Sequence, residues 1–196
     1  MNSEFAVAIL AGGRSTRMGR DKAQLVFEGR TLLERQVALA WSLGPREVWV
    51  AGRTDAELGG VRARGVNDAQ PGQGPLGGLA AVLAAANAAH VLVLAVDMPA
   101  LTDDFLRRLL TARSPGVGVV PQTARGWEAV AAVYPHELAP LVQAALAVGR
   151  RAMHDLVDEG VAAGLLCAWP VAPQEDGFLI NWNRPEDVGE GMASPR

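Results

Sequence analysis

The 196-residue sequence has little of the two residue types that most often build metal and nucleophile sites, with one cysteine and three histidines. A single cysteine, Cys167, excludes an internal disulfide and any metal site made from several cysteines. The histidines, His90, His136 and His154, are too far apart in sequence to predict a zinc motif. The sequence therefore does not favour catalysis by a histidine, serine or cysteine constellation.

The sequence also lacks an excess of positive charge and an uninterrupted membrane-length apolar run. The net charge of −3 argues against a broad nucleic-acid or membrane surface, so no nucleic-acid or membrane partner is expected. Residues 76–96 are nearly uncharged, but they are rich in alanine and glycine and contain Asn87 and His90, which predicts a buried helix and strand. The stretch MNSEF at the start carries an acid, unlike a signal peptide, and a cytoplasmic protein is expected.

Lysine is the scarcest charged residue. Of 18 basic residues only Lys22 is a lysine, and it ends the stretch LAGGRSTRMGRDK, residues 10–22. An ammonium kept at one place in an arginine-biased chain suggests a specific contact there.

The apolar pattern alternates between strand-like and helix-like segments. We expect strands at residues 4–11, 47–52, 61–66, 90–97, 117–122, 128–134, 164–171 and 178–182. We expect helices at residues 31–43, 76–89, 102–113, 137–149 and 151–160. This order predicts one α/β domain with a mainly parallel central sheet.

Polar segments follow several of the expected strands. The glycine loop, Asp68, Asp97 and residues 181–183 each lie at or just beyond the end of an expected strand. Ligands of parallel sheets bind beyond the carboxyl ends of the strands, so we expect these segments at one edge of the sheet.

The glycine loop has the composition of a phosphate site. Gly12, Gly13 and Gly19 allow backbone amides to approach a ligand, while Arg14, Arg17 and Lys22 add positive charge; the alternative is a glycine-rich turn with solvated arginines. Neither the P-loop pattern nor the dinucleotide pattern G-x-G-x-x-G is present.

Asp97 ends a buried strand, where a carboxylate needs a partner. Mg²⁺ bridging this carboxylate and bound phosphates is the favoured reading, and a salt bridge or helix cap is the alternative. Asp68 could bond to a base or sugar or only lie in a turn. Asn181 and Asn183 face the same way, and an amide oxygen there could complete a magnesium shell or cap a following helix.

With these residues in place, the chain resembles the molybdenum cofactor guanylyltransferases among the Rossmann-like nucleotidyltransferases. The resemblance is carried by LAGGRSTRMGRDK, LLERQ, GPLGGL, VDMP and NWNRPED, in that order along nearly the whole chain. It implies a single Rossmann-like three-layer sandwich of the nucleotide-diphospho-sugar transferase type, with residues 1–100 mainly nucleotide-binding and 101–196 mainly acceptor-binding.

The resemblance also implies roles for particular residues. Leu10, Ala11 and Gly12 would hold the nucleotide through their backbone, and Gly13 with Arg17 would wrap the phosphates. Lys22 would neutralise the triphosphate and Asp68 would help to fix the guanosine. Asp97, with Asn183, would bind Mg²⁺. Lys22, Arg17 and Asp97 would thus form the catalytic group.

The sequence departs from the family pattern at two places. Gly52 stands where the family usually has asparagine and cannot make that side-chain contact with guanosine, which leaves Arg53 or the backbone as the substitute contact. The segment GWEAV, residues 126–130, differs on the acceptor side, where Arg150 and Arg151 are candidate pterin contacts or simply a solvated helix start.

The implied reaction transfers GMP from GTP to the terminal phosphate of molybdenum-molybdopterin and releases pyrophosphate, with transient contacts to cofactor-synthesis proteins and recipient molybdoenzymes. A phosphate acceptor is already a nucleophile, so positioning and electrostatics suffice without a base. The alternatives are a relative that uses CTP with the same pterin or another nucleotide with a sugar or polyol phosphate, and a non-catalytic nucleotide-binding adaptor.

Overall fold

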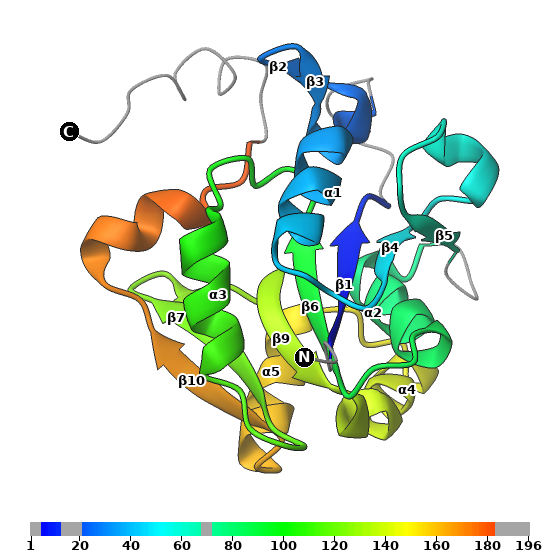
Figure 1. The fold of residues 1–196 in the computed structure, drawn as a ribbon. Coiled ribbons are helices and arrows are strands. Elements are labelled where there is room, and N and C mark those ends of the chain that lie inside the picture. The colour runs from blue at the N-terminus through cyan, green and yellow to red at the C-terminus, as the bar shows by residue number, and fades with distance from the viewer. Residues whose placement is uncertain (1–4, 13–20, 68–71, 183–196) are drawn as a thin grey trace.

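The computed structural model describes residues 5–12, 21–67 and 72–182. Its central feature is an eight-stranded sheet in the order β10-β7-β9-β6-β1-β4-β5, with β8 paired to β7 (Figure 1). The strands of this sheet are β1 Phe5–Leu10, β4 Val48–Ala51, β5 Arg64–Val66, β6 His90–Ala95, β7 Gly118–Thr123, β8 Gly126–Trp127, β9 Ala131–Pro135 and β10 Leu166–Pro170. A separate hairpin joins β2 Val26–Phe27 and β3 Arg30–Thr31.

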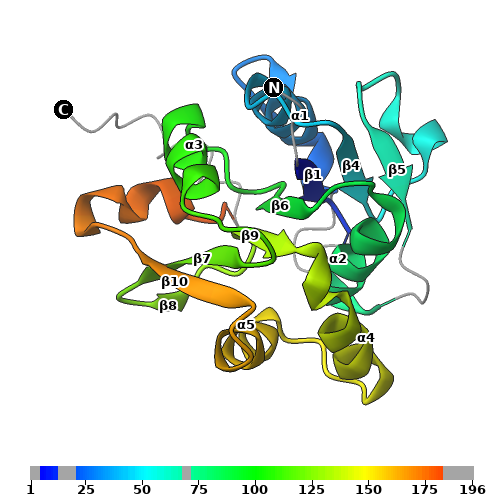
Figure 2. The ribbon, with the colours of Figure 1, turned by 60° about the horizontal axis from the view of Figure 1, so that its bottom comes forward.

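In the part of the chain that the structure describes, five α-helices cover the two faces of this sheet. They are α1 Leu32–Ser42, α2 Gly74–Ala85, α3 Asp103–Thr111, α4 Ala139–Ala147 and α5 Met153–Ala162. Figure 2 shows α1 and α3 on one face and α2, α4 and α5 on the other. The short 3₁₀ turns are η1 Lys22–Gln24, η2 Asp55–Leu58, η3 His136–Leu138 and η4 Pro173–Leu179. The predicted three-layer α/β architecture is confirmed.

The alternation of side chains along β1 explains why the sheet is covered on both faces. All six residues of β1 are buried. Val7 and Ile9 join the core that packs under α1 and α3, whereas Ala6 and Ala8 join the core under α2, α4 and α5. A strand buried on both faces reads as a continuous apolar run, which is why the sequence predicted β1 and β6 well.

Strand direction brings several chain segments to one edge. β1 pairs in parallel with both β4 and β6, and β4 pairs in parallel with β5, so Leu10, Ala51, Val66 and Ala95 end on the same side. β9 runs antiparallel to β6 and β7. The sheet is therefore mainly parallel, with its carboxyl edge formed where sequence analysis placed the site.

The helix starts follow ordinary capping chemistry. Thr31 and Glu34 form a capping box at α1, and the hydrogen bonds from the Thr31 backbone N–H and hydroxyl lower the pKa of Glu34. Thr102 caps α3 by accepting from the Phe105 N–H at 3.3 Å. Among the described residues, no helix is long and apolar enough to cross a membrane.

One predicted strand is wrong. Residues 178–182 were expected to be extended and paired, but Phe178 and Leu179 belong to η4 and no strand follows up to residue 182. The apolar residues pack against the core instead of pairing with a neighbouring strand, as Phe178 meets Phe105 with ring centroids 6.0 Å apart. Trp182 lies outside the sheet, and its backbone N–H donates to the Asp97 carbonyl oxygen at 2.8 Å.

Candidate functional site

The charged centre of the site is an ion pair between Lys22 and Asp97. Lys22 Nζ lies 2.6 Å from Asp97 Oδ2, although 75 residues separate them in sequence. Their side chains are only 21% and 16% exposed, so the pair lies largely out of solvent. Lys22 begins η1 after the glycine loop, and Asp97 follows β6 at the carboxyl edge of the sheet. The only lysine of the chain thus meets the predicted carboxylate.

Three hydrogen bonds hold the segment that carries Asp97. The Val96 N–H donates to the Leu10 carbonyl oxygen at 3.2 Å, and the Trp182 N–H donates to the Asp97 carbonyl oxygen. The side chain of Gln36 donates from Nε2 to the Met98 carbonyl oxygen at 2.8 Å. The carboxylate therefore projects from a turn whose backbone is tied to β1, to α1 and to the segment after η4.

Gln36 was missed in the sequence analysis. It is 2% exposed and lies on the buried face of α1, together with Leu32, Leu33, Val37 and Ala40. A buried amide needs a hydrogen-bond partner, which Gln36 finds in the chain next to Asp97. The available signal was a polar residue at an apolar position of the helix pattern.

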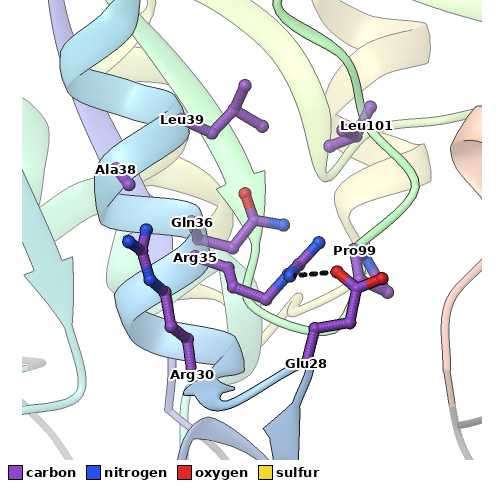
Figure 3. A pocket seen from close by; sticks show the side chains of 8 residues that line it. All are labelled: Glu28, Arg30, Arg35, Gln36, Ala38, Leu39, Pro99 and Leu101. Carbon is purple, nitrogen blue, oxygen red and sulfur yellow. Dashed lines mark hydrogen bonds and ion pairs between the residues drawn. The ribbon is translucent and has the colours of Figure 1, made fainter.

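A cavity of about 490 Å³ lies beside this helix. It is bordered by Glu28, Arg30, Arg35, Gln36, Ala38, Leu39, Pro99 and Leu101. Figure 3 shows Arg35 reaching toward Glu28, to which it is paired at 2.8 Å, and Gln36 between Leu39 and Arg35. Pro99 is two residues from Asp97, so the cavity is lined in part by the segment that carries this carboxylate.

The glycine approach after β1 is also visible. Gly12 lies against Gly52, and a Cβ placed on Gly12 would be 3.3 Å from the Gly52 Cα. The Ala11 N–H donates to the Ala51 carbonyl oxygen at 3.1 Å, and the Leu10 carbonyl oxygen already accepts from Val96. The backbone of residues 10–12, which is expected to hold a nucleotide, is thus hydrogen-bonded to β4 on one side and to the segment after β6 on the other.

Gly52 itself adopts a conformation that favours glycine. Its φ is +83°, and a Cβ there would lie 2.4 Å from the Gly12 Cα and 2.8 Å from the Gly12 N. An asparagine, the residue usual in the resembled family, does not fit this backbone arrangement. Arg53, the expected substitute contact, is instead engaged by Asp21, with Arg53 Nη2 2.5 Å from Asp21 Oδ2.

The other candidate residues divide into two groups. Gly13, Arg14, Arg17, Gly19, Asp68 and Asn183 lie outside the described residues. Arg150, a candidate pterin contact, pairs with Glu159 of α5. Asn181 lies next to Trp182, close in the chain to the hydrogen bond with Asp97.

Aromatic contacts close the site on the side of the β2–β3 hairpin. Phe27 and Trp182 pack edge to face with centroids 4.8 Å apart, and the Arg35 guanidinium lies 4.7 Å from the Phe27 ring centroid. These contacts join the hairpin to the late segment that binds Asp97. In residues 5–12, 21–67 and 72–182 there is no group of three histidine, cysteine or acidic side chains that could hold a metal.

Comparison with known proteins identifies a family and relatives that match most of the chain. The family described as MobA-like NTP transferase domain matches residues 7–161. A probable molybdenum cofactor guanylyltransferase from Opitutus terrae is 38% identical over 188 residues, which cover 94% of this chain and 93% of that protein. A molybdenum cofactor guanylyltransferase from Pseudomonas putida KT2440 is 32% identical over 92% of this chain and 94% of its own length.

Solved structures agree on the fold. The crystal structure of molybdopterin-guanine dinucleotide biosynthesis protein A from Archaeoglobus fulgidus superposes with a TM-score of 0.76 at 21% identity, covering 94% of this chain and 95% of that one. A nucleotidyl transferase from Methanothermobacter superposes with a TM-score of 0.73 at 22% identity, covering 95% and 94%. The chain belongs to the MobA-like NTP transferases, a family of nucleotidyltransferases, in which its curated relatives along nearly the whole length are molybdenum cofactor guanylyltransferases.

Proposed function

We propose that this protein transfers GMP from GTP to the terminal phosphate of molybdenum-molybdopterin, forming the guanine dinucleotide cofactor and releasing pyrophosphate. The observation that carries the proposal is the Lys22–Asp97 pair at the carboxyl edge of the sheet, directly after the glycine loop. Curated relatives with this activity in their names cover more than nine-tenths of the chain and support the choice of nucleotide and acceptor.

The residues present match what this reaction requires. The acceptor phosphate attacks the α-phosphorus of GTP, and the bond to the β-phosphate oxygen breaks as pyrophosphate leaves. The nucleophile is already ionised, so the protein has to align the two phosphates and offset their charge. Lys22 supplies a compact cation on a flexible stem, which suits a contact with phosphate oxygens.

The donor chemistry at Asp97 fits Mg²⁺. Mg²⁺ sites in nucleotide enzymes use one or two carboxylates, with substrate phosphates and water filling the other positions. Asp97 offers one such carboxylate, and Asn183 stays a predicted additional ligand that lies outside the described residues. When bound, the ion would neutralise phosphate charge. Lys22 would then leave Asp97 for the triphosphate, with Arg17 as a further predicted catalytic cation.

The two halves of the chain would share the work. Residues 1–100 contain the glycine loop, Asp68 and Asp97, and we assign them mainly to the nucleotide. Residues 101–196 would mainly bind the pterin acceptor. Magnesium dependence, the pterin contacts and contacts with other proteins of cofactor synthesis all belong to this proposal.

The direct test is a transfer assay with purified protein, labelled GTP, Mg²⁺ and freshly prepared molybdenum-molybdopterin. We expect pyrophosphate and the guanine dinucleotide to form together, with little product from CTP. Lys22→Met and Asp97→Asn should each lower kcat by at least about 100-fold, because each removes charge that stabilises the transition state.

The control is Arg107→Met, which removes an exposed arginine paired with Asp103 in α3 and should retain activity. Product formation with CTP in preference to GTP would overturn the substrate assignment. Near-normal turnover of a folded Lys22→Met or Asp97→Asn protein would overturn the role given to that residue.

A further inference from the structure

A second ion pair lies directly beside the Lys22–Asp97 pair. Asp21 precedes Lys22, and its Oδ2 receives the Arg53 guanidinium at 2.5 Å, while its Oδ1 accepts the Ala23 N–H at 3.1 Å. Arg53 stands two positions after the end of β4, and Asp97 two positions after the end of β6. The two adjacent charges of residues 21–22 are therefore tied to segments that follow different strands.

The turn that carries Lys22 is short and depends on this anchoring. η1 has three residues, and Asp21 is its N-cap. A single 3₁₀ turn has poor internal hydrogen bonding, so contacts around it contribute to its position, among them the burial of Ala23 in the core and the ion pair of Asp21. Arg53 fixes the capping carboxylate with a planar, always charged guanidinium that is 19% exposed.

We propose that Arg53 is a positioning residue for catalysis: through Asp21 it holds the Lys22 turn in register with Asp97. The inference rests on the proposed function, because it assigns Lys22 to the triphosphate. Arg53 Nη2 already has a partly buried carboxylate partner in Asp21, and enzyme kinetics distinguish this positioning role from a direct nucleotide contact. Arg53 also follows Gly52, whose backbone lies against Gly12, so the same segment aligns the end of β1.

This role has a kinetic signature. If Arg53 only aligns Lys22, its loss weakens the transition-state contact more than ground-state binding, so kcat falls while KM for GTP changes little. If Arg53 binds the nucleotide itself, KM should rise. Misplacement of a catalytic cation by a fraction of its side-chain length is enough to cost about 10- to 100-fold in rate.

The test uses Arg53→Met, Asp21→Asn and the double variant, each assayed for kcat, KM and GTP affinity. Asp21→Asn keeps an oxygen that can accept the Ala23 N–H, so it removes the ion pair and leaves the cap. We expect each single variant to lower kcat about 10-fold or more with KM within about threefold, and the double variant to match the worse single one. Arg107→Met serves as the matched control for losing a paired arginine.

Effects of the two substitutions that multiply in the double variant would overturn the inference, as would a rise in KM with kcat unchanged. If Arg53→Met fails to fold, Asp21→Asn alone decides between a loss of kcat and no loss. If the wild-type protein transfers no GMP, the proposed function fails first. The positioning role is then read from the pairing itself: the losses of thermal stability in Arg53→Met and Asp21→Asn should fail to add in the double variant, and additive losses would overturn it.

Discussion

At the scale of the residue, the contact of Gly12 with Gly52 determines how the end of β1 meets the end of β4. The space between the two backbones leaves no room for a side chain at residue 52. Gly52 also has a positive φ, which residues other than glycine adopt only at a cost in free energy. The local backbone therefore accounts for glycine at residue 52 in place of the asparagine usual in the family.

Gly52→Asn should therefore not restore a nucleotide contact. We expect the free energy of unfolding to fall by at least about 1–3 kcal/mol, because of backbone strain and the clash with Gly12. GTP should also bind more weakly. Thermal unfolding and GTP titration measure the two effects. Gly149→Asn is the matched control, because Gly149 also has a positive φ, of +76°, but its Cβ would meet nothing within 4 Å. Equal losses in the two variants would contradict the steric argument.

At the scale of the element, α1 connects the hairpin to the site. Its capping box begins at Thr31, the last residue of β3, and its buried Gln36 donates to the turn that carries Asp97. A change at the start of α1 should therefore affect both the stability of the helix and the placement of the Met98 carbonyl oxygen.

Thr31→Ala removes the side chain that accepts the Glu34 N–H at 3.1 Å. We expect the free energy of unfolding to fall by about 1 kcal/mol, because an N-cap is lost. The melting temperature should fall by about 2–4 °C for a domain of this size. Thr111→Ala is the control, since this exposed hydroxyl bonds within its own helix, to the Arg107 carbonyl oxygen. A larger loss in the control would overturn the assignment of the cap.

Predictability also differed between elements. Sequence analysis recognised β1 and β6 by their continuous apolar runs, because both faces of these strands are buried. It recognised α1 and α3 by their periodic patterns, because one face of each helix is buried. The β2–β3 hairpin and β8 were not predicted, since two-residue strands carry too little pattern. The expected strand at 178–182 failed because its apolar residues pack onto α3 and the hairpin, which a periodicity of two does not distinguish from pairing.

At the scale of the whole molecule, nucleotide binding should stabilise the fold as one unit. The site joins η1, the ends of β1, β4 and β6 and residue 182, which come from both ends of the sequence. A nucleotide bound across these segments would raise the free energy needed to unfold each of them.

A thermal shift with GTP, CTP, UTP and ATP measures this linkage. GTP at 100 times its dissociation constant should stabilise the protein by about 2.7 kcal/mol. The melting temperature should then rise by about 5–10 °C. The shift should require Mg²⁺ and should be lost in Asp97→Asn. An equal shift with all four nucleotides would contradict the guanosine preference, and a full shift in chelator would contradict the role of the metal.

The sequence by itself determined the fold class, the order of most elements and the two charges at the centre of the site. Burial on two faces leaves apolar runs, and a lone lysine and a carboxylate after a buried strand are visible without coordinates. Only the tertiary structure decided that Lys22 meets Asp97, that Arg53 engages Asp21, that Gln36 holds the Met98 carbonyl and that Gly12 packs on Gly52. Such contacts depend on strand order and on the path of each turn, and local periodicity contains no information about either.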